Sequence, residues 1–437
     1  MISRMMGVCQ GSGKRVSKST MEVPAEERAA DAPHSDVAVI GAGAHGAAAA
    51  YHLAKAGSDV LVLEKAPADS GDGVALRHGS SGGESRRFSL TNFSAHKTTM
   101  CQLGLQLWHE AEEEHGSTLL HHKGSIDITG RNSGPMRGIM RAAAANSVPL
   151  DVMDAAAVVK KWPAFAGMGY DAVGLWNKDG GILNPVECIG AFRSMAQRHG
   201  AKLCFGEETC SISWKGGDEL FEICTRRLES GHVQRYTCGH LVLAPGAWLQ
   251  PCLEMLGSAY VPTTIAEMSY GFYEVAPAAK DAMSSCPVWR SFYGCGCYGF
   301  PVYEKEGWVK VAPFGCARSC YYRTAEERSN KPNFSHWNQT AGFVGELFGQ
   351  NLSGGKHGHE HTCLYTYTAD NEFILDSHPK FPAGRVVVSG GYCDSGFKHC
   401  ALMGKAVSTM VRNDGQCSLF DIRPFSITRP SLGASFR

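Results

Sequence analysis

Three glycines spaced as Gly-x-Gly-x-x-Gly follow an apolar run near the N-terminus. The run DVAVI covers residues 36–40, and the next six residues, GAGAHG, contain Gly41, Gly43 and Gly46. In such a turn the first glycine permits a tight bend and the second lets a pyrophosphate approach the backbone. The third allows a helix to pack closely on a strand. The spacing therefore predicts a dinucleotide site at the start of a helix.

An acidic residue stands where the ribose of such a nucleotide would lie. The helix AAAAYHLAKAG is followed by a second predicted strand, DVLVLEK, over residues 59–65. Glu64 comes at the end of this strand, where one carboxylate can accept hydrogen bonds from both ribose hydroxyls. We assign Glu64 and the neighbouring Lys65 to the predicted cofactor site.

The next segment favours FAD over NAD. A nicotinamide-binding domain usually continues quickly into another strand–helix unit. Here a loop rich in glycine and serine, RHGSSGGESRRFS over residues 77–89, leads into LTNFSAHKTTMCQLGLQLWHEAEEEHG, which indicates one long helix.

Three later stretches return to the pattern of a nucleotide-binding lobe. Residues 188–205 predict a helix and a strand, and 240–253 predict a buried strand that ends in Gly-Ala-Trp. Residues 385–411 predict a strand, a glycine turn and a helix. The intervening residues 261–361 are richer in aromatic side chains and short strands, which is typical of an antiparallel sheet. The expected fold class is α/β with an α+β substrate lobe.

The two lobes are therefore expected to be interleaved along the chain. We expect a discontinuous FAD-binding domain from residues 36–125, 180–260 and 362–430. A substrate domain that covers the flavin would come from residues 126–179 and 261–361.

Residues 1–35 are predicted to be an extension of the fold. Four basic residues precede the first acidic one, Glu22, and there is no apolar segment of a secretory signal. A mitochondrial or plastid presequence and a disordered tail both remain open. The chain ends in ASFR rather than the peroxisomal SKL. We expect an intracellular, soluble protein of the cytoplasm or an organelle.

The composition argues against several other functions. The 437 residues include 42 Lys and Arg against 42 Asp and Glu, so no net field favours nucleic acid or an anionic membrane. No segment is predicted to span a membrane. His357, His359 and His361 alternate, but no paired-cysteine motif completes a zinc site. We interpret them as part of a solvated loop and expect no metal.

Several motifs, in the same order, resemble those of one family. Cys363 lies in HTCLYTYTADNEFILDSHP, residues 361–379, just ahead of a predicted strand. GSSGGESR at 79–86, GFK at 396–398 and FDIRPFSITRPSL at 420–432 lie on either side of it in the chain. Together these runs resemble the monomeric sarcosine oxidase and N-methyltryptophan oxidase family, which belongs to the D-amino acid oxidase superfamily. The resemblance extends over about residues 36–430.

The resemblance implies a fold, a cofactor and roles for individual residues. It implies a Rossmann-like FAD-binding domain with an interleaved antiparallel sheet, and FAD joined to Cys363 through a thioether. Lys310, in GWVKVAPF, matches the lysine that activates dioxygen, and alternation puts it on one strand face with Trp308 and Ala312. Lys398 matches the lysine that pairs with the substrate carboxylate. The residues that the family places at the cofactor are Ser80, Ser81, Arg86, Cys363, Gly391, Gly396 and Lys398.

The reaction that the resemblance implies is oxidation of a C–N bond. Family members take a hydride equivalent from a secondary amine to the flavin, leaving an imine that water hydrolyses. Dioxygen then reoxidises the flavin and becomes hydrogen peroxide. The expected partners are a small amine and dioxygen, with no nucleic acid, and the protein is expected to be a monomer.

Three positions depart from the family pattern and leave the substrate open. The family arginine that pairs with the substrate carboxylate falls on Ser89, a frequent pocket histidine falls on Phe314, and the histidine of the late turn falls on Ser395. Arg87 lies two residues before Ser89, so on an extended segment it points to the same side and could replace the missing cation.

Two other functions remain open from the sequence. One is a flavin dehydrogenase of the same superfamily that oxidises an amine or a 2-hydroxy acid and passes electrons to a carrier protein. The other is a flavin-binding protein that has lost catalysis.

Overall fold

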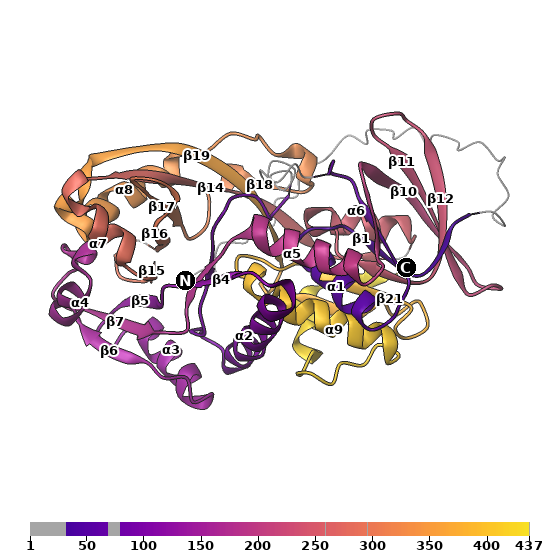
Figure 1. Ribbon diagram of the computed structural model, residues 1–437, viewed down its shortest axis with the longest axis horizontal. Coiled ribbons are helices and arrows are strands. Elements are labelled where there is room, and N and C mark those ends of the chain that lie inside the picture. The colour runs from indigo at the N-terminus through magenta and orange to yellow at the C-terminus, as the bar shows by residue number, and fades with distance from the viewer. Residues whose placement is uncertain (1–31, 69–78, 258, 295, 437) are drawn as a thin grey trace. The chain divides into compact units, whose positions relative to one another are not determined.

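Two large β-sheets organise the chain in the computed structural model, which describes residues 32–68, 79–257, 259–294 and 296–436 (Figure 1). Residues 33–437 belong to one compact unit. Most of the predicted extension and the first two residues of the predicted loop at 77–89 lie outside the described residues. The fold itself begins at β1, two residues earlier than expected.

The first sheet holds the strands around the glycine turn. Its order is β10-β11-β12-β1-β2-β9, with β21 beside β12 and β20 beside β21. The bounds are β1 His34–Ile40, β2 Val60–Glu64, β9 Lys202–Phe205, β10 Glu207–Lys215, β11 Leu220–Arg227, β12 Val233–Leu243, β20 Ile374–Ser377 and β21 Val386–Gly390. Pairing is parallel along β9, β2, β1, β12 and β21, which is typical of a nucleotide-binding fold.

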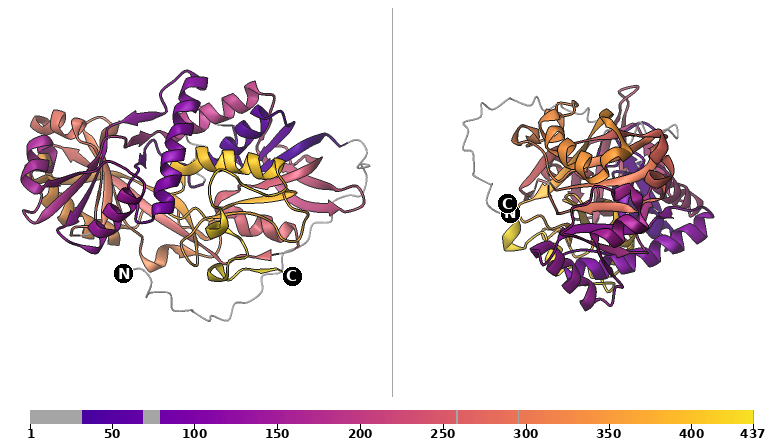
Figure 2. Two further views of the ribbon diagram at one scale, coloured as in Figure 1. Left: turned by 90° about the horizontal axis from the view of Figure 1, so that it is seen from below. Right: turned by 90° about the vertical axis from the view of Figure 1, so that its left-hand side faces the viewer.

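Both faces of this sheet are buried because the strands alternate between two cores. Val37 and Val39 face a core shared with the helices, whereas Ala38 and Ile40 face the opposite one. The helices of the first core are α1 Ala44–Lys55, α2 Ala95–His115, α5 Pro185–Arg198 and α9 Cys400–Arg412. The opposite core includes α6 Leu249–Met255. Figure 2 shows α9, in yellow, beside strands of this sheet.

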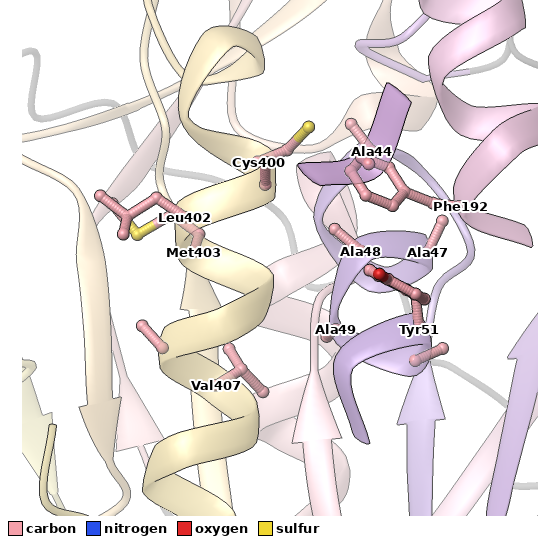
Figure 3. Close-up of a cluster of buried hydrophobic side chains, with 14 of the residues drawn as sticks. Ala44, Ala47, Ala48, Ala49, Tyr51, Phe192, Cys400, Leu402, Met403 and Val407 are labelled. Carbon is pink, nitrogen blue, oxygen red and sulfur yellow. The ribbon is translucent and has the colours of Figure 1, made fainter. Parts of the chain in front are cut away.

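Small residues let α1 and α9 approach each other closely. A Cβ added to Gly404 would lie 2.5 Å from the carbonyl carbon of Ala48. Cys400 and Val407 of α9 face the alanines of α1 across this contact, and Phe192 of α5 packs beside Tyr51 (Figure 3). The first and last helices of the lobe are thereby joined, although they are far apart in sequence.

The second sheet is mostly antiparallel. Its order is β18-β14-β17-β16-β15-β5-β7-β6, with β19 beside β14. The bounds are β5 Ser125–Gly130, β6 Asp151–Asp154, β7 Ala172–Asn177, β14 Thr263–Val275, β15 Val288–Ser291, β16 Cys297–Lys305, β17 Trp308–Pro313, β18 Tyr321–Tyr322 and β19 Leu352–Thr368. The helices α3 Gly134–Ala145, α4 Ala155–Lys161, α7 Lys280–Ser285 and α8 Phe334–Phe348 accompany it.

Two small sheets complete the described structure. The first has the order β3-β8-β4, with bounds β3 Arg86–Phe88, β4 Leu120–His122 and β8 Gly181–Leu183. The second pairs β13 Ala259–Tyr260 with β22 Ser435–Phe436. The three-stranded sheet fixes the segment that carries Arg86 and Arg87, because β3 lies against the buried β8.

The expected α/β fold with an interleaved antiparallel sheet is confirmed. The division into domains remains a prediction, and one strand crosses its boundary at residues 361 and 362. Residues 362–368 are part of β19 and pair with β14, so they belong to the second sheet.

The interpretation of the histidine segment as a loop is wrong. His357, His359 and His361 lie on β19 and are exposed; His357 and His361 pair with β14, and His359 lies at a shift in the register. In the described part of the chain, no group of three metal-binding side chains is close enough to hold an ion. No helix among the same residues has the length and apolar character of a membrane span.

Candidate active site

The glycine turn has the geometry that only glycine allows at two positions. Gly41 has φ +98°, and its amide donates to the Leu63 carbonyl at 2.8 Å. A Cβ on Gly41 would lie 2.6 Å from the Ala244 carbonyl oxygen, and one on Gly46 would lie 1.8 Å from the Gly41 carbonyl oxygen. These two glycines therefore set the close contact between β1, α1 and the end of β12.

The second glycine of the motif, Gly43, leaves room at the start of α1. Gly43 is the N-cap residue and provides no side-chain cap for the helix amides. The nearest atom to a Cβ built on it would be Ser81 Oγ at 3.6 Å. Ser81 thus lies beside the helix N-terminus, where a phosphate would find amide donors and a favourable dipole.

The two residues that end β2 point to different partners. Glu64 accepts hydrogen bonds from the amides of Ala42 at 2.7 Å and Ala66 at 2.8 Å, which fixes its carboxylate beside the glycine turn. Lys65 forms a 2.8 Å ion pair with Glu208 and is half-exposed. Glu64 thus lies beside the glycine turn, whereas Lys65 extends toward β10.

Arg86 holds the glycine- and serine-rich loop in place. Its Nη2 donates to the carbonyls of Ser80 at 3.0 Å and Gly82 at 2.6 Å, and its Nη1 donates to that of Ser85 at 2.8 Å. Gly83 has φ +88°, so the tight course of the loop depends on glycine there as well.

Lys310 is buried beside this loop. It lies on β17 with 3% of its surface exposed, and Trp308 and Ala312 share its face as predicted. Its Nζ is 2.7 Å from Glu304 Oε1 and 3.2 Å from Ser85 Oγ. A Cβ built on Gly83 would be 3.5 Å from both Lys310 Nζ and Arg86 Nη1, so the two cations meet at one point of the loop.

Cys363 packs into the same region from β19. It is opposite Met268 of β14 and is 7% exposed, in a cluster that includes Tyr270. Burial raises the pKa of the Cys363 thiol, while the charges of Arg86 and Lys310 oppose that rise. Burial outweighs the two cations, so the pKa of the thiol stays above that of a free cysteine. Cys363, Arg86 and Lys310 come from three distant parts of the sequence.

A second group of cations surrounds Ser89. Arg87 donates to Ser89 Oγ at 2.6 Å, and Lys398 Nζ donates to the Ser89 carbonyl at 3.4 Å. Arg87 also pairs with Asp127 at 2.9 Å, and Arg290 holds the same carboxylate at 2.8 and 3.1 Å. The Arg87 guanidinium therefore reaches Ser89, on the side that an extended segment predicted.

This second group, defined as Arg87, Arg290, Lys398 and Asp127, has more cations than anions. Burial raises the pKa of Asp127, but Arg290 and Arg87 outweigh this and hold it below its usual value. Burial and the charges of the two arginines lower the pKa of Lys398. Among the residues that the structure describes, Arg87 and Arg290 share Asp127 as their salt-bridge partner, and Lys398 pairs with no carboxylate. An anionic ligand would relieve this imbalance.

Aromatic side chains adjoin these cations. Phe314 lies 5.3 Å from Phe292 and stacks with Tyr298 at 6.2 Å between ring centroids. Arg290 lies over the Phe292 ring at 4.7 Å. Phe314 thus contributes to an apolar surface next to charged groups.

The late glycine turn places Lys398. Gly391 has φ +60°, and a Cβ on Gly396 would lie 2.3 Å from Tyr392 Cβ. The short helix Phe397–His399 then begins, and Lys398 is 7% exposed. Its Nζ also donates to Asn92 Oδ1 at 3.2 Å, so side-chain and backbone oxygens position it.

Sequence reasoning missed Glu304, Asp127 and Arg290. Asp127 and Arg290 lie on the adjacent strands β5 and β15, which pair with each other in register. The one available signal for Asp127 was a charged residue inside the apolar strand SIDITG. Glu304 had no signal, because it stands in a run of polar residues near a hairpin turn.

Comparison with known proteins identifies the family. The family model described as FAD dependent oxidoreductase matches residues 36–410. The chain belongs to this family. It is 29% identical to a monomeric sarcosine oxidase from Streptomyces avermitilis, over 86% of this chain and 94% of that protein. It is 23% identical to an N-methyl-L-tryptophan oxidase from Yersinia pestis, over 90% and 99% of the two chains. These matches confirm the resemblance found in the sequence motifs.

The fold comparison agrees. The solved structure of NikD, described as an unusual amino acid oxidase essential for nikkomycin biosynthesis, superposes with a TM-score of 0.74 at 21% identity. It covers 90% of this oxidoreductase and 97% of NikD.

The residues present fit FAD. The uncapped start of α1, the space beside Gly43 and the Ser81 hydroxyl suit a pyrophosphate. Glu64 is fixed by two backbone amides and stands at the carboxyl end of β2, where a ribose diol would be held. When bound, FAD accepts two electrons from a substrate and passes them to an acceptor.

We expect Glu64→Ala to weaken FAD binding, because the variant loses the carboxylate that would accept from the ribose. The test compares Cys363→Ala with Cys363→Ala/Glu64→Ala, so that no covalent link masks the effect. Flavin content per purified chain, read from the visible spectrum, should fall in the double variant. Equal flavin content in the two proteins would rule out this role for Glu64.

Proposed function

We propose that this oxidoreductase is an oxidase of N-alkyl amino acids or related secondary amines. It converts the C–N bond to an imine, which water hydrolyses, and dioxygen is reduced to hydrogen peroxide. The names of the relatives support the substrate class, since two of them act on sarcosine and on N-methyl-L-tryptophan. The observation that carries the proposal is the meeting of Lys310, Arg86 and Cys363 in one buried cluster.

Lys310 is assigned the reaction with dioxygen. Transfer of an electron to dioxygen builds negative charge, and a fixed buried ammonium stabilises it more than water does. Lys310 is held by Glu304 and Ser85, so its ammonium does not need to reorient during the reaction.

Lys398 and Arg87 are assigned the substrate carboxylate. Both contact Ser89, and their group has more positive than negative charges. A substrate carboxylate there would form charge-assisted hydrogen bonds and reduce the excess of positive charge. Arg290 supports Arg87 indirectly by holding Asp127. In this proposal, Phe314, Phe292 and Tyr298 contact the apolar part of the substrate.

The first sheet and its helices are proposed to hold the nucleotide, and the second sheet to cover the substrate. The glycine turn, Glu64 and Lys398 belong to segments attached to the first sheet. Lys310 and Cys363 belong to the second.

An anaerobic spectral screen tests the function. Bleaching of the oxidised flavin by N-methyl amino acids, cyclic imino acids or glycated amino acids would identify a substrate. No bleaching by any amine would favour a protein that has lost catalysis. Peroxide output in air then separates an oxidase from a dehydrogenase that needs a carrier protein.

We also propose that FAD is joined to Cys363 by a thioether. Cys363 is buried beside Arg86 and Lys310, whose charges oppose part of the rise that burial causes in its pKa. We expect the flavin to stay with wild-type protein after acid precipitation, whereas Cys363→Ala and Cys363→Ser should release any flavin they still bind. Absorbance of the supernatant measures the difference, and a yellow supernatant from wild type would refute the linkage.

A further inference from the structure

Glu304 forms the closest polar contact of Lys310. The two side chains are 9% and 4% exposed and meet at 2.7 Å. Ser85 Oγ donates to the same carboxylate oxygen of Glu304 and lies 3.2 Å from the ammonium. Glu304, Lys310 and Ser85 therefore form a closed triangle of contacts beside the loop that Arg86 holds.

The position of Glu304 depends on an irregular hairpin. The register of β16 against β17 shifts on both sides of Val302, between Gly299 and Lys305. Such a bulge re-aims side chains that regular alternation would place elsewhere. In this hairpin it brings a carboxylate to Lys310, six residues later in the chain.

Lys310 has few other groups that favour its charged form. Arg86 faces it from β3, Tyr270 of β14 lies 4.1 Å away at its ring centroid, and Cys363 faces it from β19. Burial and Arg86 lower the pKa of Lys310, while Glu304 and, more weakly, Cys363 raise it. Glu304 is ionised in this setting. Burial raises its pKa, but Lys310, Ser85 and Arg86 together outweigh burial and hold the pKa below its usual value.

We infer that Glu304 is a positioning residue that keeps Lys310 protonated and fixed in place for the reaction with dioxygen. This inference rests on the oxygen role proposed for Lys310. The step itself moves two electrons from reduced FAD and two protons to dioxygen, giving oxidised FAD and hydrogen peroxide. Glu304 contributes no atom to it and acts only through the charge and position of Lys310.

The variant Glu304→Gln keeps the shape of the side chain and removes its charge. Lys310 would then lose its proton at a lower pH, because the carboxylate that pairs with it is gone. At low pH the ammonium persists without an opposing charge, so reoxidation should be at least as fast as in wild type. At high pH reoxidation should fall, by on the order of tenfold or more, toward the rate of Lys310→Met. The two pH profiles are thus expected to cross.

The kinetic test uses holoenzyme reduced photochemically, so that it does not depend on the identity of the amine. Reoxidation by dioxygen is followed by stopped flow between about pH 6 and about pH 10. The matched control is Glu306→Gln in the same hairpin, whose carboxylate is exposed and pairs with the surface residue Lys280. Its profile should match that of wild type. Superimposable profiles for Glu304→Gln and wild type would overturn the inference.

A second readout is independent of turnover. The thermal unfolding temperature is measured for four holoproteins: wild type, Glu304→Gln, Lys310→Met and the double variant. Together these four proteins form a double-mutant cycle. Glu304→Gln should unfold several degrees below wild type at neutral pH, because a buried cation has lost its partner, and the added Lys310→Met should restore much of the loss. The deficit of Glu304→Gln should shrink as pH rises, since the folded state then holds Lys310 neutral.

The two proposals fail in distinguishable ways. If Lys310→Met reoxidises at the wild-type rate, the oxygen role of Lys310 is wrong. If Lys310→Met is slow but the Glu304→Gln profile is not displaced, only the role of Glu304 is wrong. A deficit in unfolding that is additive and independent of pH would likewise overturn the role of Glu304.

Discussion

Lys310→Met is expected to slow the reoxidation of reduced enzyme by on the order of a hundred- to a thousandfold. Two unit charges at ~4 Å interact by roughly 4 kcal/mol at an effective dielectric of ~20, and this energy corresponds to about a thousandfold in rate. Glu304 lies 2.7 Å from the ammonium and opposes part of its field, so we expect the lower part of the range. Methionine keeps most of the side-chain volume and removes the charge.

Measuring flavin reduction and flavin reoxidation separately distinguishes this role of Lys310 from a general loss of structure. Anaerobic reduction by a good amine should change much less than reoxidation, because it builds no charge at this point. Stopped-flow absorbance at the flavin band measures both rates. An unchanged reoxidation rate would make Lys310 a bystander, and an equal loss in both halves would indicate a collapsed pocket.

Lys398→Met is expected to lower the efficiency of flavin reduction by an amino acid substrate by on the order of a hundredfold. This efficiency is the ratio of the rate constant for flavin reduction to the substrate dissociation constant. The estimate follows from a lost hydrogen bond between charged groups, which is worth about 1.5–3 kcal/mol. Wild type should react much faster with the acid than with its amide, whereas the variant should treat the two alike. This comparison distinguishes a lost carboxylate contact from a damaged fold.

Lys405→Met provides the matched control for Lys398→Met. Lys405 lies on α9, the helix that directly follows the short helix of Lys398, but it is exposed. Its substitution should leave the preference for the acid intact. If Lys398→Met also retained that preference, the substrate carboxylate would bind elsewhere or be absent.

Local sequence sufficed for the parts of the site that depend on backbone geometry. The contacts of Gly41 and Gly46 follow from the tight turn itself, and the face shared by Lys310 and Ala312 follows from strand alternation. These features involve residues close together in the chain, so their spacing carries the information.

The electrostatic partners could not be predicted in the same way. Arg290 and Asp127 are 163 residues apart, and only the pairing of β15 with β5 brings them together. Glu304 is close to Lys310 in sequence, but its orientation depends on a bulge that the residue types of this hairpin do not predict. The histidine segment was not predicted as a strand because its polar residues have low strand propensity. Pairing with β14 overrides this low propensity in the folded protein.

The position of β21 has a consequence for the order of assembly. This strand and α9 come near the end of the chain, yet they pack against β12 and α1, which are made much earlier. At ~5–20 residues per second, tens of seconds of synthesis separate the glycine turn from Lys398. During synthesis the nucleotide lobe therefore stays incomplete until β21 and α9 have been made.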